Sequence, residues 1–156
     1  MKSLRLALAV LGMGCVFGGS AVQATDSVTA EGYWLTENKR SVIRIVPCAD
    51  DAAKLCGHIH WVIPGGLEFD IKNPDETKRS RSTCGLPILT DFKKQSATMW
   101  GDGKIYKADD GDIYNATMQL LPNGNLIVRG YVGMPLFGKS QTWTRVSTTE
   151  YQACKK

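Results

Sequence analysis

Short segments in which apolar and polar residues alternate recur along the chain from residue 32 onward. None of them shows the sustained three-to-four-residue period of an amphipathic helix. In residues 41–46, Ile43 and Ile45 share one face while Arg44 lies on the other. Turn-forming residues separate these segments, a pattern typical of β-sandwiches and β-barrels.

The alternation predicts seven or eight consecutive strands. Their expected ranges are 32–36, 41–46, 55–63, 86–92, 98–106, a strand between the turns at 110–111 and 123–124, 126–132 and 141–146. Within 55–63 we expect Ile59, Trp61 and Ile63 on one face, opposite His58 and His60. The fifth strand is interrupted at residues 101–103 by a bulge or a turn. Asp-Gly and Asn-Gly pairs are strong hairpin signals, because these turns need positive φ. Tightly connected strands favour an all-β, single antiparallel up-and-down barrel of about eight strands, which leaves no exposed sheet edge.

The first residues have the layout of a secretory signal peptide. Lys2 and Arg5 precede an apolar run over residues 6–17, and small residues follow up to Ala24. We predict cleavage after Ala24, so that residues 1–24 are removed and residues 25–156 form a single barrel domain. A retained anchor is disfavoured, because about 20 apolar residues are needed to span a bilayer. Lipidation of Cys15 is disfavoured as well, because the preceding leucine lies one position too far upstream.

Loss of the signal peptide lowers the basic count from 19 to 17, against 15 acidic residues. This near balance gives no electrostatic reason to expect binding to nucleic acid. The densest basic stretch, Lys78, Arg79 and Arg81, is interpreted as a solvated loop. We expect no transmembrane segment in the processed chain and a periplasmic or secreted location.

Four cysteines remain after processing, an even count that indicates two disulfides in an exported protein. Four cysteines allow three pairings. Cys48 and Cys56 are close in sequence at the ends of two expected strands, which favours a bond between them and leaves Cys84 for Cys154. The loop lengths would contribute roughly 2.6 and 4.4 kcal/mol in the chain-entropy model. The spacing is not Cys-x-x-Cys, so these cysteines are interpreted as structural rather than redox-active.

An ordered set of short motifs resembles a bacterial family known as domain of unknown function 2147. The matching segments are Gly32-Tyr33-Trp34, Cys48 with Leu55-Cys56-Gly57, Asp70-Ile71-Lys72-Asn73-Pro74, residues 100–106, Asp110-Gly111, Tyr114, Arg129-Gly130-Tyr131 and residues 138–145. The resemblance implies an exported protein with a lipocalin-like barrel. It implies no particular reaction, because no activity is established for the family. Cys84 and Cys154 depart from the family pattern and suit a disulfide particular to this protein.

A looser likeness is to lipocalins and related calycin barrels. These carry Gly-x-Trp on the first strand and a basic residue near the end of the last, as Gly32, Trp34 and Arg145 do here. The likeness implies that the cation packs over the indole and closes one end of the barrel. We therefore interpret Gly32, Trp34, Trp143 and Arg145 as structural rather than ligand-binding.

The sequence contains no nucleophile elbow, no His-Glu-x-x-His motif and no phosphate-binding glycine loop of known spacing. His58 and His60 could chelate a metal only if a third ligand approached, so a solvent-facing or polar-core role is preferred. Asp70, Asn73 and Asp75 could donate oxygens to calcium, but Asx-turn closure before a proline explains them as well. We expect neither a metal nor a cofactor.

The barrel interior is the feature most suited to a function, because an eight-stranded barrel is either filled or holds one small ligand. The candidates to line or cap such a cavity are Tyr106, Tyr114, Met118, Tyr131 and Phe137, although an ordinary core role is preferred for any one of them.

The leading hypothesis is a non-enzymatic binding module for a small apolar or amphipathic ligand. The alternative is an envelope protein partner bound by the irregular segment at residues 64–83, which is long for a compact domain. A third hypothesis is an enzyme whose polar site forms only in three dimensions, for example from Asp70, His58 and Arg129.

Overall fold

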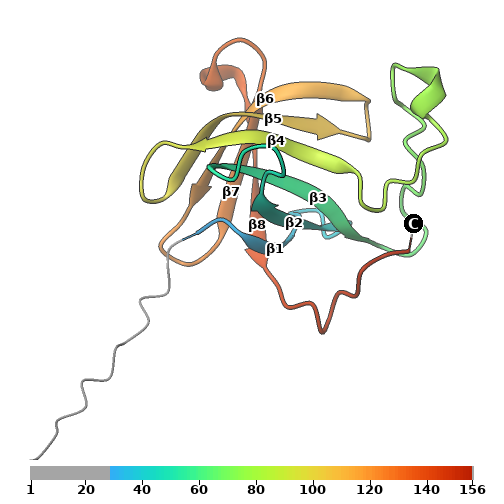
Figure 1. Cartoon of the computed structure of the whole chain (residues 1–156), viewed down its shortest axis with the longest axis horizontal. Coiled ribbons are helices and arrows are strands. Elements are labelled where there is room, and N and C mark those ends of the chain that lie inside the picture. Colours follow the sequence, from blue (N-terminus) through green and yellow to red (C-terminus); the bar gives the residue numbers. More distant parts are fainter. Residues whose placement is uncertain (1–28, 156) are drawn as a thin grey trace, which may run out of the picture.

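The computed structural model describes residues 29–155 and contains one closed barrel of eight antiparallel strands. The strands are β1 (Gly32–Leu35), β2 (Ser41–Pro47), β3 (Lys54–Val62), β4 (Pro87–Lys94), β5 (Met99–Lys107), β6 (Asp112–Leu120), β7 (Leu126–Tyr131) and β8 (Lys139–Arg145). Each strand pairs with the next, and β8 returns to β1, which confirms the predicted fold (Figure 1). The predicted signal peptide, residues 1–24, lies outside the described residues. No helix within residues 29–155 is long and apolar enough to span a bilayer.

The connections emerge alternately at the two ends of the barrel, because consecutive strands are antiparallel. One end carries the segments 36–40, 63–86, 108–111 and 132–138, and is called the open end below. The other end carries the chain before β1 and the turns at 48–53, 95–98 and 121–125, and is called the closed end. Two short 3₁₀ turns, η1 (Glu76–Lys78) and η2 (Pro135–Phe137), both belong to open-end segments.

Large apolar side chains fill the half of the barrel toward the closed end. Every second residue of a strand points inward, so all eight strands contribute to this packing. The largest fully buried members are Trp34, Trp143, Phe92, Ile43, Ile45, Leu89, Met118 and Leu126. Such close packing is the main source of stability in a domain of this size.

A β-bulge in β3 changes which side chains of that strand face inward. Ile43 of β2 pairs with Ile59, but the preceding Val42 pairs with Trp61, so β3 holds one extra residue at this point. Beyond the bulge Val62 packs against the core, while Trp61 contacts Tyr151. The prediction that Ile59, Trp61 and Ile63 share a face is therefore wrong, because one inserted residue reverses the alternation.

A second bulge explains the interruption expected at residues 101–103. β5 is continuous, but its register with β6 shifts between Trp100 and Gly103, and Asp102 has a φ of 57°. The two hairpin turns form as predicted, with Gly111 and Gly124 both at a φ of 83°. Local turn chemistry was therefore a sound guide to these two connections, one at each end of the barrel.

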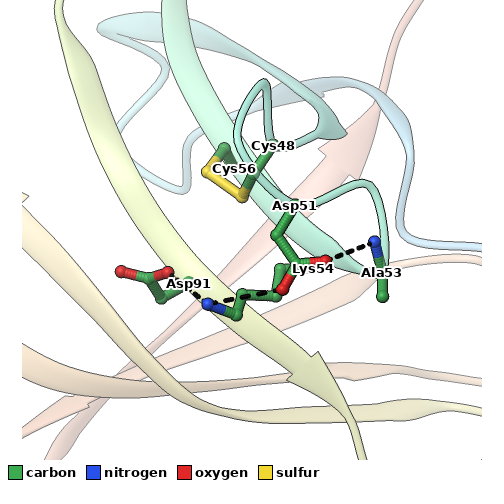
Figure 2. Close-up of a disulfide and its surroundings, with 6 residues drawn as sticks. All are labelled: Cys48, Asp51, Ala53, Lys54, Cys56 and Asp91. Carbon is green, nitrogen blue, oxygen red and sulfur yellow. Dashed lines mark hydrogen bonds and ion pairs between the residues drawn. A yellow bond between two sulfur atoms is a disulfide. The ribbon is translucent and has the colours of Figure 1, made fainter.

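Two disulfides join the pairs that the sequence favoured. Cys48–Cys56 links β2 to β3 across the turn at the closed end, with 4.9 Å between the Cα atoms. Figure 2 shows this bond beside Lys54, whose ammonium group lies 3.1 Å from the Asp91 carboxylate. Cys84–Cys154 ties the C-terminal segment to the connection between β3 and β4.

The C-terminal segment lies against the outer surface of β3. The Cys154 N–H donates to the His60 carbonyl, and the His60 Nε2 lies 3.1 Å from the Tyr151 carbonyl oxygen. The Tyr151 ring meets Trp61 edge to face, with centroids 5.0 Å apart. Val42, on the same outer surface, is fully buried. The segment after β8 thus covers apolar surface that a bare barrel would leave exposed.

Candidate functional site

Trp34 and Arg145 seal the closed end of the barrel. The Trp34 indole is fully buried, and its Nε1–H donates to the Ala30 carbonyl at 2.8 Å. The Arg145 guanidinium lies over the ring, 4.2 Å from its centroid. The same guanidinium donates to the carbonyls of Glu31 and Thr29, at 2.7 and 2.8 Å. A ligand therefore has no route into the barrel from this end.

Gly32 allows this arrangement. Its φ is +126°, and a Cβ added there would lie 2.5 Å from Nη1 of Arg145. A side chain would push the guanidinium off the indole and would strain the backbone. On the neighbouring strand, the Trp143 Nε1–H donates to the Gln141 side-chain oxygen at 2.8 Å, so that indole points from the filled core toward the open end.

A first hollow at the open end lies inside the barrel mouth, with a volume of about 790 Å³ including the opening. Its floor is apolar and is formed by Trp143, Ile59, Ile88 and Ile105. Its rim is polar and comes from the β1–β2, β3–β4 and β5–β6 connections. The rim residues include Thr36, Asn38, Arg40, Ser41, Thr83, Lys107 and Asp109.

The second hollow, of about 840 Å³ including its opening, lies between β5, β6, β7 and the β7–β8 connection. It shares Ile105, Lys107 and Gln141 with the first, so the two adjoin at the same end of the barrel. The other lining residues are Asp110, Tyr114, Val128, Gly130, Tyr131, Val132, Phe137 and Lys139. Both hollows combine apolar walls with a few polar groups, the composition typical of small-molecule sites.

The structure distributes the five cavity candidates from the sequence over these hollows. Tyr106 lines the first; Tyr114, Tyr131 and Phe137 line the second. Met118 lines neither, because it is fully buried and packed in the filled core. Alternation placed Met118 on the inner face, but it could not show how far along the barrel the filling extends.

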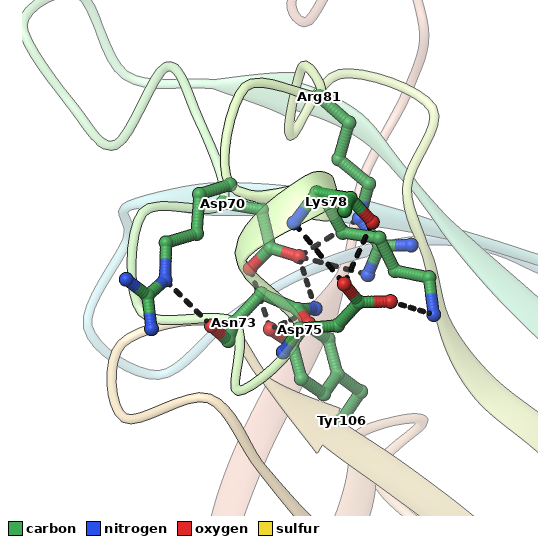
Figure 3. Close-up of polar contacts among 8 residues, drawn as sticks. Asp70, Asn73, Asp75, Lys78, Arg81 and Tyr106 are labelled. Atoms are coloured by element: carbon green, nitrogen blue, oxygen red, sulfur yellow. Dashed lines mark hydrogen bonds and ion pairs between the residues drawn. The ribbon is translucent and has the colours of Figure 1, made fainter.

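A buried carboxylate holds the long β3–β4 connection onto the barrel (Figure 3). Asp70 is fully buried and accepts hydrogen bonds from Arg81 at 2.8 Å, from the Asn73 amide at 2.8 Å and from the Tyr106 hydroxyl at 2.5 Å. Tyr106 belongs to β5, so this cluster joins the connection to the barrel wall. Burial, followed by the hydrogen bond to Asp70, raises the pKa of the Tyr106 phenol.

Gly111 provides a second point of attachment for the same connection. Its φ is +83°, and a Cβ there would lie 1.9 Å from the Lys72 carbonyl oxygen. The turn between β5 and β6 therefore packs directly against the backbone of the 70–73 segment. These contacts fix the connection over the mouth of the first hollow, which Leu67 and Thr83 help to line.

The Asp70 cluster changes two interpretations made from the sequence. Arg81, predicted to be solvated with Lys78 and Arg79, is the charge partner of Asp70, with its side chain 38% exposed. The prediction for Arg81 is therefore wrong, because the partner lies 11 residues away and no local pattern marks it. Both oxygens of the Asp70 carboxylate accept hydrogen bonds from protein donors. The hypothesis that Asp70, Asn73 and Asp75 bind calcium therefore loses its main ligand.

Asp75 has a separate role from Asp70. Its carboxylate accepts from the backbone N–H and the hydroxyl of Thr77, at 3.1 and 2.6 Å, and so caps η1. These bonds, with those from Lys78, lower its pKa to about 2. Among residues 29–155, no three His, Cys, Asp or Glu side chains gather as a metal site would require.

Two of the three residues in the enzyme hypothesis, Asp70 and Arg129, have different partners. Asp70 contacts Arg81, Asn73 and Tyr106, whereas Arg129 donates to the Pro135 and Leu136 carbonyls of the β7–β8 connection. His60, the neighbour of His58 on the outer face of β3, packs against Tyr33 with ring centroids 4.6 Å apart. Asp70 and Arg129 thus each hold a connection at the open end instead of sharing one polar site.

Tyr106→Phe is expected to lower the free energy of unfolding by about 1.5 kcal/mol, because the buried Asp70 carboxylate loses one of its donors. Tyr114→Phe is the matched control, since its hydroxyl makes an exposed, 3.3 Å contact with Asp110. Its removal is expected to cost less than about 0.5 kcal/mol. Urea unfolding followed by circular dichroism measures both. Equal losses in the two variants would contradict the role assigned to the Asp70 cluster.

Residues 32–145 match the model of a family described as "Uncharacterized protein conserved in bacteria (DUF2147)". A solved structure with a similar fold is protein HP1028 from Helicobacter pylori, which is described as belonging to the lipocalin family. The similarity covers 77% of this chain and 84% of that protein, with 25% sequence identity and a TM-score of 0.68. The present barrel is therefore lipocalin-like. No curated protein sequence gives a significant match.

Proposed function

We propose that this chain, which belongs to the bacterial family DUF2147, is an exported, non-enzymatic protein whose barrel binds a small apolar or amphipathic ligand through its open end. The observation that carries the proposal is the unequal filling of the barrel. The closed end is solid and sealed by Trp34 and Arg145, while two adjoining hollows lie at the open end.

The chemistry of the hollows supports an amphipathic ligand. Their walls are made by Ile59, Ile88, Ile105 and Val128, against which an alkyl or aromatic group would pack. Charged groups such as Arg40, Lys107 and Asp109 lie at the rim, where a head group could remain in contact with water, while Gln141 adds a polar group inside both hollows. The hydrogen bond from Lys107 to Asp110 raises the pKa of the ammonium group. Bound in this way, a ligand would leave its apolar part inside and its polar part at the mouth.

Export is supported by the two disulfides, since such bonds persist in oxidising compartments. The predicted signal peptide agrees with this location, although it falls outside the described residues. A non-enzymatic role is supported by the structural role of polar side chains at the open end. Asp70, Arg81 and Arg129 all make contacts that hold connections in place.

The proposal is tested by native mass spectrometry of the protein purified from its own cell envelope, together with displacement of a fluorescent fatty-acid probe. We expect a bound small molecule and displacement of the probe by lipids. Ile105 lines both hollows, so Ile105→Trp is expected to weaken probe binding about tenfold or more by filling the space.

Met99→Trp is the matched control, because Met99 lies on the same strand near the closed end and lines neither hollow. Its affinity for the probe should stay within about twofold of the wild type. Absence of any bound molecule and of probe binding would refute the proposal. Unchanged binding in a folded Ile105→Trp variant would show that the ligand lies outside the barrel.

A further inference from the structure

The connection between β7 and β8 exposes a run of large apolar side chains. Val132, Met134, Leu136 and Phe137 are 70%, 60%, 78% and 73% exposed. Residues 132–137 are called the apolar loop below. Ile113 of β6 is also exposed. It lies near the base of the apolar loop, because it comes two residues before Asn115, which pairs with Tyr131 at the end of β7. Contiguous apolar exposure of this kind in a folded domain marks an interaction site.

Specific contacts hold the apolar loop in this exposed conformation. The Arg129 guanidinium donates to the Pro135 carbonyl at 2.8 Å and to the Leu136 carbonyl at 3.2 Å. The loop ends at Gly138, where a Cβ would lie 2.6 Å from the Gly130 carbonyl oxygen, so it is packed closely against β7. Figure 1 shows it projecting from the barrel beyond the ends of β7 and β8. Its backbone is thus ordered by polar contacts while its apolar side chains remain in water.

The ligand hollow explains only part of the apolar loop. Val132 and Phe137 line the second hollow, but Met134 and Leu136 line neither hollow. Leu136 is the most exposed of the four. A surface outside the barrel is needed to account for these two side chains.

The charge around the apolar loop favours an anionic surface. From residue 113 to residue 149 the chain has no Asp or Glu, whereas Arg129 and Lys139 lie at the base of the apolar loop. The acidic groups beside the apolar loop along the barrel rim are Glu37 of the β1–β2 connection, which accepts from the Thr142 N–H, and Asp109, Asp110 and Asp112 at the β5–β6 turn. One of these charges, Asp110, is paired with Lys107. Contact with an anionic surface is therefore expected through the apolar loop and Lys139, with the acidic β1–β2 and β5–β6 connections kept away from it.

We propose that the apolar loop inserts into the surface of an anionic phospholipid bilayer. Met134 and Leu136 would enter the boundary between head groups and acyl chains, and Lys139 would lie at the level of the phosphates. A few residues at a protruding tip suit a deformable bilayer. They are too few for a stable protein interface, which takes about 20–30 residues from each partner. The proposal concerns a different surface from the barrel interior and does not depend on the proposed ligand.

Cosedimentation with vesicles of phosphatidylethanolamine and phosphatidylglycerol tests this proposal, using protein expressed from the full-length sequence. We expect the wild type to bind these vesicles severalfold more tightly than vesicles of phosphatidylcholine alone. Met134→Asp and Leu136→Asp are each expected to weaken binding about tenfold or more, because a charge at this depth opposes insertion. Leu136→Trp should show a blue shift of its fluorescence on adding the anionic vesicles.

Met99→Asp is the matched control, since Met99 is a partly exposed methionine at the closed end, away from the apolar loop. It should bind vesicles as the wild type does. Met134→Asp should retain the fluorescent-probe affinity of the barrel, so loss of membrane binding is distinguishable from loss of the ligand site. Three results would overturn the proposal: no binding of the wild type, equal losses in Met134→Asp and Met99→Asp, or a dimer that depends on Leu136 without lipid.

Discussion

Trp34→Ala is expected to lower the free energy of unfolding by about 4 kcal/mol, the typical cost of deleting a large buried aromatic side chain. The indole is fully buried among the core side chains of the closed end. Its loss also leaves the Ala30 carbonyl without a donor and removes the ring beneath Arg145. Because Trp34 and Leu35 provide both residue pairs of β1 with β8, the variant weakens the seam that closes the barrel.

Trp61→Ala is the control for this measurement. Trp61 is partly exposed on the outer surface, where it contacts Tyr151, and its removal is expected to cost about 1 kcal/mol. Urea denaturation followed by far-UV circular dichroism gives both values. If the two variants lost similar stability, the closed end would not be the principal core of the barrel.

Removal of the Cys84–Cys154 disulfide by the double substitution Cys84→Ser, Cys154→Ser is expected to cost about 4 kcal/mol. The bond joins residues separated by 70 positions, so it restricts the unfolded chain strongly. The Cys48–Cys56 bond spans only 8 positions. The corresponding double serine variant should therefore lose less stability, about 2.6 kcal/mol in the same model. Chemical denaturation of the two variants under identical conditions makes this comparison.

The Cys84–Cys154 variant should also show a local effect that the other lacks. Without the bond, the C-terminal segment still has the contacts of Tyr151 and of the Cys154 N–H to hold it against β3. Amide hydrogen exchange is expected to become faster at Cys154 and at Val42, whose pair partner Trp61 contacts Tyr151. Unchanged exchange at these positions would show that the Cys84–Cys154 disulfide does not hold the C-terminal segment in place. A larger loss of stability in the Cys48–Cys56 variant would show that the Cys84–Cys154 disulfide contributes less to stability than its loop length predicts.

The sequence alone determined the architecture of the barrel. Alternation with a period of two marked the strands, and the glycine turns at residues 110–111 and 123–124 marked their connections. These signals are local, because inward and outward positions follow directly from the pleat of each strand. Gly32, Trp34 and Arg145 were also recognisable from sequence, since their resemblance to lipocalins and calycins depends on residue types at the two ends of the barrel. The even number of cysteines indicated two disulfides and their spacing favoured Cys48–Cys56, but the structure decided among the three possible pairings.

Only the tertiary structure decided which side chains past the β3 bulge face inward, since a single inserted residue shifted Trp61 to the outer surface and Val62 to the core. It also paired Asp70 with Arg81 and Tyr106, which come from two different parts of the chain. The extent of the filled core, and hence the exclusion of Met118 from the hollows, depends on contacts among all eight strands. Such features follow from register and from long-range packing, which the alternation within one strand does not contain.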